Sequence, residues 1–133
     1  MNLRKLGQIR AKYYRLMHAV REHLLEKGYV CLASPTSSIS VIGVIEEKGR
    51  LKARLIHVCL SGRLSEPAME ALRNISRMVP SAEIIVAVPE VEVDEEKKTA
   101  RIREKPKLYR FDPKIKVYGT DLVALKQKGY RIF

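Results

Sequence analysis

The chain of 133 residues contains no tryptophan and only two cysteines, and aromatic residues make up 6% of it. Cys31 and Cys59 are too few for the disulfide framework of a small secreted protein, so we expect a reducing, cytoplasmic environment. No apolar run approaches the roughly 20 residues of a membrane-spanning helix, so we expect no membrane partner. The glycines show neither GxxxxGK nor GxGxxG spacing, which argues against the common phosphate-binding loops.

What the chain does contain is a large basic excess. It has 26 lysines and arginines against 15 acidic residues, a net charge of +11. The excess lies in residues 1–30, 48–54 and 101–133, whereas residues 61–100 are slightly acidic. Such charge can serve solubility alone, but its segregation favours a polyanionic partner, nucleic acid first, with DNA ahead of RNA. The candidate phosphate-binding side chains are Arg4, Lys5, Arg10, Lys12, Arg15, Lys48, Arg50, Lys52, Arg54, Arg101 and Arg103.

The apolar spacing predicts one α/β domain over residues 1–133. Apolar residues stepping by three or four from Leu3 to Leu24 predict a long helix that ends at Gly28. Ser65 is expected to cap a second helix, which Pro80 ends. Strands are predicted at residues 29–33, 40–45, 53–60 and 83–88, with a hairpin turn at 48–50. The third of these regions, 53–60, is apolar at nearly every position and is expected to be central.

The last third of the chain is predicted to be less regular. Residues 90–104 have the pattern of a solvent-exposed hairpin with a charged tip at 94–98. A short strand is predicted at 115–118. Thr120 or Asp121 is expected to cap a final helix that runs to Lys128. Four aromatic side chains could stack on unpaired bases: Tyr13, Tyr14, Tyr109 and Phe111.

Few residues suggest catalysis or metal binding. His57 and Cys59 lie two apart and share a face of their strand, and Cys31 could join them, but this spacing matches no zinc motif. The same pair is too far apart along a strand for direct proton transfer to a nucleophile. Glu46 and Glu47 flank a hairpin turn and face opposite ways. We therefore expect no metal site and no cofactor.

The first two-thirds of the chain carries an ordered series of short features. These are a basic segment, Arg4–Gly7, a helix ending in Glu26-Lys27-Gly28-Tyr29, and a strand that runs into Ser34-Pro35. Together they resemble the archaeal Holliday junction resolvases. The resemblance implies a restriction-endonuclease-like fold, with a central mixed sheet flanked by helices in the order α-β-β-β-α-β. A C-terminal hairpin and helix would follow here, and the resemblance also implies a homodimer.

The resemblance further implies where a nuclease site would lie. The family places an Asp before the second strand, a Glu-x-Lys on the third strand and a Glu early in the first helix. The strand positions here carry Ser40, His57 and Cys59, and the first helix has no acid before Glu22. Mg²⁺ in such a site needs carboxylate oxygens. We therefore predict a catalytically inactive, resolvase-like protein that binds nucleic acid mainly through phosphates.

Two alternatives remain open at this point. The chain could be a noncatalytic structural subunit of a nuclease complex such as a tRNA-splicing endonuclease, with the charged hairpin contacting a protein partner. It could also be an active nuclease whose metal site has moved to Glu46 or Glu47.

Overall fold

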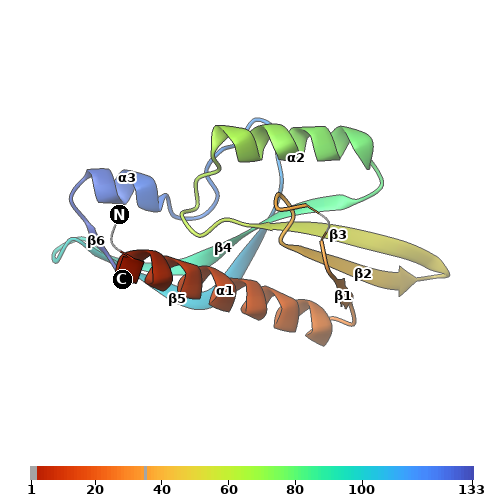
Figure 1. The fold of residues 1–133 in the computed structure, drawn as a ribbon, viewed down its shortest axis with the longest axis horizontal. Helices are drawn as coiled ribbons and strands as arrows, with labels where there is room; N and C mark the ends of the chain where they lie inside the picture. The colour runs from red at the N-terminus through yellow and green to blue at the C-terminus, as the bar shows by residue number, and fades with distance from the viewer. Residues whose placement is uncertain (1–2, 35) are drawn as a thin grey trace.

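Six strands form one mixed, open sheet with helices on both faces (Figure 1). The structure is a computed structural model that describes residues 3–34 and 36–133, with side chains from Gly7 onward. The helices are α1 (Leu3–Glu26), α2 (Glu66–Met78) and α3 (Leu122–Gln127). The strands are β1 (Val30–Leu32), β2 (Val41–Glu47), β3 (Arg50–Val58), β4 (Glu83–Asp94), β5 (Thr99–Arg110) and β6 (Arg131–Ile132). The predicted α/β class with a central mixed sheet is confirmed.

The strands lie in the sheet in chain order, and their directions follow from the connections. β1, β2 and β3 form an antiparallel meander. The crossover through α2 brings β4 parallel to β3, because a helical connection returns the chain to the same end of the sheet. β5 pairs antiparallel with β4, and β6 pairs parallel with β5 over two residues.

Two apolar clusters cover the two faces of this sheet. The α1-side cluster consists of Leu16, Val20, Leu24, Val41, Ile56, Val58, Ile85 and Ala87. The α2-side cluster includes Met69, Leu72, Ile84, Val86, Val88, Cys59 and Phe111. β3 and β4 contribute alternate residues to both clusters, so the prediction of a central third strand is confirmed for its second half. The first half of β3, from Arg50 to Lys52, is exposed.

The predicted helix ends are confirmed by their capping contacts. The Ser65 hydroxyl accepts a hydrogen bond from the Ala68 N–H at 3.2 Å, at the start of α2. Of the two candidates for capping α3, Asp121 is the N-cap residue, and its carboxylate accepts from the Ala124 N–H. Gly28, with a φ of +90°, follows the end of α1. Short polar side chains and glycine thus mark these boundaries as local rules predict.

The predicted hairpin over residues 90–104 is confirmed, with its turn at 95–98 between β4 and β5. Its arms are longer than predicted, because β4 and β5 run as 12-residue strands within the main sheet, with a register shift between Pro89 and Val91. Pro89 and Pro106 pair with each other immediately beside that shift, an irregular position of the kind that tolerates proline within a sheet. The strand predicted nearby is wrong. Residues 115–118 form no strand, and only an isolated bridge joins Val117 to Arg63.

Candidate nucleic-acid interface

Ser40 joins α1, β2 and β3 through uncharged hydrogen bonds. Its hydroxyl lies 2.9 Å from the Tyr13 hydroxyl of α1 and accepts from the Val58 N–H at 3.1 Å. Its backbone N–H donates to the Ile56 carbonyl at 2.7 Å. The position for which the resemblance implies a metal-binding carboxylate is therefore occupied by a hydroxyl that is bonded within the fold.

His57 and Cys59 lie on the opposite face of the sheet from α1. Leu55 and Cys59 pack with the α2-side cluster, whereas Ile56 and Val58 belong to the α1-side cluster. Side chains alternate along a strand, so His57 also faces α2. A site built jointly from α1 and β3 would have to use the β3 side chains that face α1, which are Ile56 and Val58. Ser40, His57 and Cys59 thus do not meet in one pocket, and both faces of this part of β3 lack a carboxylate.

Burial keeps both polar side chains of this β3 segment uncharged at neutral pH. Burial lowers the pKa of His57, and its Nδ1 lies 2.6 Å from the Ser38 carbonyl oxygen, to which it donates. Burial also raises the pKa of the Cys59 thiol, whose Sγ lies 3.8 Å from the Ser61 hydroxyl. Since the thiolate is the nucleophilic form, Cys59 is suited to packing and not to covalent catalysis.

The lowered pKa of His57 predicts a loss of stability in mild acid. The unfolded chain binds a proton near the ordinary histidine pKa of 6.5, whereas the folded chain binds it only at lower pH. Stability is therefore fully present above pH 6.5 and falls as the pH drops toward the folded pKa, by about 1.4 kcal/mol for each pH unit that separates the two pKa values. Urea unfolding at pH 7.5 and pH 5.5 should show a smaller loss in His57→Gln than in the wild type. Equal losses in both proteins would contradict the assignment.

The sheet separates the two thiols that could have shared a metal. Cys31 packs against the α1-side cluster and Cys59 lies in the α2-side cluster. Across residues 3–34 and 36–133, no group of three or more His, Cys, Asp or Glu side chains is arranged to hold a metal ion. Glu46 and Glu47 are exposed at the end of β2, and the Glu47 carboxylate lies 2.6 Å from Lys52 Nζ. The hydrogen bond from Lys52 lowers the pKa of Glu47.

Four of the predicted phosphate-binding residues lie on the β2–β3 hairpin. They are Lys48, Arg50, Lys52 and Arg54. Two of them have acidic partners, since Lys52 pairs with Glu47 and Arg54 Nε lies 3.3 Å from Glu83. The Arg54 guanidinium also stacks 5.2 Å above the ring of Tyr29. The hairpin projects from the end of the sheet opposite α3 and β6 (Figure 1).

The predicted basic residues of α1 lie on two flanks of the helix. Lys12 and Arg15 face β5, where they line a small depression with Ile102, and Arg15 Nε lies 2.7 Å from Glu104. Each residue of a helix is rotated by about 100° from the one before it, so Arg10 and Lys12, two positions apart, differ by about 200°. Arg10 is exposed and lies on the opposite flank of α1 from Lys12. Arg4 and Lys5 belong to α1, but their side chains lie outside the described residues.

β5 carries a row of four basic side chains on the face away from α1. Arg101 and Arg103 are among the predicted phosphate-binding residues, and Arg103 lies 2.8 Å from Glu92 on β4. Lys105 and Lys107 are exposed and follow after the register shift, and the pairing of Lys107 with Val88 of the α2-side cluster places Lys107 on the same face as Arg101 and Arg103. The hairpin predicted from the sequence ends at residue 104 and misses both lysines. The alternation of basic residues on either side of Pro106 was the signal that could have found them.

These residues of α1 and β5 flank the same free edge of the sheet, with Lys12 and Arg15 on the α1 face and the β5 row on the other face. We call it the β5-edge surface and define it as Lys12, Arg15, Arg101, Arg103, Lys105 and Lys107. The acids beside it are Glu90, Glu92 and Glu104, of which two are held in ion pairs. From Arg103 onward β5 borders no further strand in the described part of the chain. Lysines and a proline on an edge strand discourage pairing with another chain, so this edge remains open to other ligands.

A largely apolar groove of about 470 Å³ adjoins the β5-edge surface. It opens between the N-terminal half of α1, the chain that follows β3, and α3. Its described lining residues are Gln8, Ile9, Lys12, Leu60, Ser61, Ile102, Leu122, Val123, Lys126 and Ile132. We call it the terminal groove, because the beginning of α1 and the last strand both lie at this end of the molecule (Figure 1). Lys12 and Ile102 also line the depression beside Arg15, which makes the two regions continuous.

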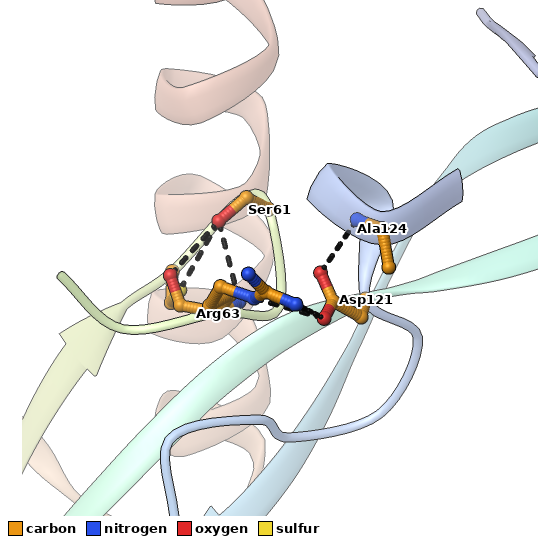
Figure 2. Close-up of polar contacts among 5 residues, drawn as sticks. Ser61, Arg63, Asp121 and Ala124 are labelled. Carbon is orange, nitrogen blue, oxygen red and sulfur yellow. Dashed lines mark hydrogen bonds and ion pairs between the residues drawn. The ribbon is translucent and has the colours of Figure 1, made fainter. Parts of the chain in front are cut away.

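A polar network holds α3 against the loop that follows β3 (Figure 2). Arg63 Nε donates to Asp121 Oδ2 at 2.9 Å, and Asp121 Oδ1 accepts from the Ala124 N–H at 3.1 Å. The Ser61 hydroxyl accepts from the Arg63 N–H and donates to the Arg63 carbonyl. Burial raises the pKa of Asp121, but the bonds from Ala124 and Arg63 outweigh it and the pKa is lowered. The carboxylate therefore stays ionised and fixes α3 at the groove.

The structure also separates the four aromatic candidates. Phe111 is buried in the α2-side cluster, so the expectation that it stacks on bases is wrong. Tyr13 is partly buried and its hydroxyl contacts Ser40. Tyr14 and Tyr109 remain exposed, with 58% and 37% of their surfaces accessible.

No protein-family model, curated protein sequence or solved structure matches this chain. Among the residues that the structure describes, none of the helices combines the length and apolar character needed to cross a membrane.

Proposed function

We propose that this protein binds nucleic acid without cleaving it, and that the β5-edge surface contacts the phosphates. The observation that carries the proposal is that cations from opposite ends of the sequence, on α1 and β5, meet along one open sheet edge. On β5, Arg101 and Arg103 form one pair and Lys105 and Lys107 another, each about 7 Å apart along the strand, with the register shift between the two pairs. A linear row of this kind suits a linear polyanion, with DNA the first candidate. Contacts to phosphates position a nucleic acid without reading its bases, so binding would not be sequence-specific.

The order of elements supports a restriction-endonuclease-like assignment and, with it, the resemblance to resolvases. The meander β1–β3, the crossover through α2 and the parallel placement of β4 follow the order that the resemblance implies. The absence of catalysis is proposed because the implied acid positions carry Ser40, His57 and Cys59, or Ile56 and Val58 on the face toward α1. None of these side chains supplies the hard oxygen ligands that Mg²⁺ prefers.

Filter binding with labelled oligonucleotides tests the proposal directly. Single-stranded DNA, duplex DNA, a four-way junction and RNA of equal length should be titrated at several salt concentrations. We expect binding that weakens steeply with salt, because cations that contact phosphates release condensed counterions. Affinity that is independent of salt would contradict the proposal, whatever its absolute value.

A cleavage assay separates this proposal from an active nuclease with a displaced site. The four-way junction should remain intact in Mg²⁺ or Mn²⁺ at protein concentrations that bind it fully. Cutting that disappears in the double variant Glu46→Ala/Glu47→Ala would instead place an active site at the end of β2.

A noncatalytic subunit of a nuclease complex is the second candidate, and an exposed apolar face favours it. Val30, Leu32 and Leu51 are 61%, 50% and 76% accessible, on the part of the α2-side face that α2 leaves uncovered. Weak nucleic-acid binding that tightens on addition of an active nuclease subunit would favour this function. A dimer in analytical ultracentrifugation that is lost in Leu51→Glu would assign the face to a second copy, as the resemblance implies.

A further inference from the structure

The terminal groove combines an apolar wall with positive charge at its margins. Six of its described lining residues are aliphatic, and the charged ones are Lys12 on α1 and Lys126 on α3. None of the described lining residues is acidic. A volume of about 470 Å³ lies within the usual range of ligand pockets, roughly 300–1,000 Å³. The groove therefore fits a ligand with a flat or compact apolar part and a negative charge beside it.

The position of the groove in the fold also suits ligand binding. It lies beyond the carboxyl end of β3, beside Leu60 and Ser61, where the chain leaves the sheet for the crossover to the parallel strand β4. Open α/β sheets bind their ligands outside the carboxyl ends of such strands. The Leu122 N–H donates to the Ser61 carbonyl at 2.9 Å, so the α3 wall is fixed to the β3 wall by the backbone itself.

We propose that the terminal groove receives one unpaired nucleobase of the bound nucleic acid. The proposal rests on the proposed function and names the substrate class, which is nucleic acid with an unpaired end, flap or branch. A base has apolar faces and polar edges, and its flanking phosphates are anionic. The aliphatic wall would cover the faces, as in pockets that hold extruded bases. Lys12 and Lys126 would contact the adjoining phosphates.

Two further observations favour a nucleobase over other apolar anions as the ligand of the groove. The groove shares Lys12 and Ile102 with the depression that Arg15 lines on the α1 side of the sheet edge, so a strand whose phosphates contact Lys12 and Arg15 lies at its mouth. Gln8 is exposed on α1 at the groove, and its amide can donate to and accept from a base edge. A fully paired duplex keeps its bases stacked inside and cannot use the groove.

Fluorescence of 2-aminopurine tests the inference. The base should be placed at a single-stranded 3′ or 5′ overhang, at a branch, or within a blunt duplex, and the protein should be titrated at constant salt. We expect fluorescence at the unpaired position to change on binding, and the overhang to bind about tenfold more tightly than the blunt duplex. The affinity for the blunt duplex reports binding to the β5-edge surface alone, because a fully paired duplex offers no base to the groove.

Two groove variants and one matched control complete the test. Val123→Trp fills the groove and Ile9→Glu places a negative charge on its exposed wall, whereas Val79→Trp makes the same substitution at an exposed residue that follows α2 and does not line the groove. Thermal unfolding should first show that each variant folds. The groove variants should lose the tenfold preference and the fluorescence change but keep duplex affinity, and Val79→Trp should keep all three.

The outcomes separate this inference from the proposed function. Salt-dependent binding of all substrates with no preference for the overhang overturns the inference and leaves the proposed function standing. Salt-independent or undetectable binding of every substrate overturns the proposed function itself. A wild-type dimer that dissociates in Val123→Trp, with no fluorescence change on nucleic-acid binding, overturns the inference in favour of a second copy in the groove.

Discussion

Affinity for duplex DNA is expected to fall by a factor of about 60 to about 1,000 between about 50 mM and about 200 mM salt. The reason is the number of cations on the β5-edge surface. If its six side chains each neutralise one phosphate, the plot of log affinity against log salt has a slope of about −5, since each contact contributes about −0.9. The existing ion pairs of Arg15 with Glu104 and of Arg103 with Glu92 would reduce the slope if they persist in the complex. A slope between about −3 and −5 is thus the expected result, and the thousandfold change is its upper limit.

A pair of charge variants locates the source of that slope. Lys105→Gln/Lys107→Gln removes two exposed cations from β5, and the slope should become shallower by nearly 2. Lys48→Gln/Arg50→Gln removes two exposed cations from the hairpin at the other end of the sheet and serves as the matched control. Its slope should stay at the wild-type value. Equal changes in the two variants would show that the net charge of +11, and not the β5-edge surface, governs binding.

The parts of the fold that could be predicted are those with local signals. The Ser65 and Asp121 caps and the turn at Gly28 depend on bonds or dihedral angles within a few residues, and all three are confirmed. Pro89 and Pro106 show where local rules fail. Each proline alone predicts a strand end, but the register of β4 on β5 places them opposite each other, and both strands continue. That register is a long-range property that the sequence does not display.

The candidate interface likewise has features that the sequence predicts and features that depend on long-range contacts. The basic residues could be counted in the sequence, but their grouping depends on topology. The pairing of β4 with β5 extends the basic row to Lys107, and the packing of α1 on β5 adds Lys12 and Arg15 to it. Conversely, Arg54 is drawn into a pair with Glu83 by the parallel register of β3 and β4. The terminal groove could not have been predicted, because its walls come from α1, β5, α3 and β6 together.

Replacing Gly62 by alanine is expected to lower the free energy of unfolding by about 3–5 kcal/mol. Gly62 lies in the loop after β3 with a φ of +77°, and a Cβ there would lie 2.1 Å from the Thr120 carbonyl oxygen and 2.9 Å from that of Tyr118. Neither oxygen can move away easily. The segment that carries them is fixed to the same loop by the Tyr118 N–H, which donates to the Gly62 carbonyl at 2.8 Å, and by Leu122. The strain would therefore displace α3, and urea unfolding measures its cost.

Gly129→Ala provides the matched control. Gly129 has a similar φ of +89°, but nothing lies within 4 Å of the Cβ that alanine would add. Its substitution carries only the backbone penalty of the left-handed region, about 1–2 kcal/mol. The difference between the two variants isolates the steric conflict at Gly62. If both variants lose the same stability, then the contact between the β3–α2 loop and the segment before α3 does not constrain the fold, and the terminal groove would lack the rigid wall that base binding requires.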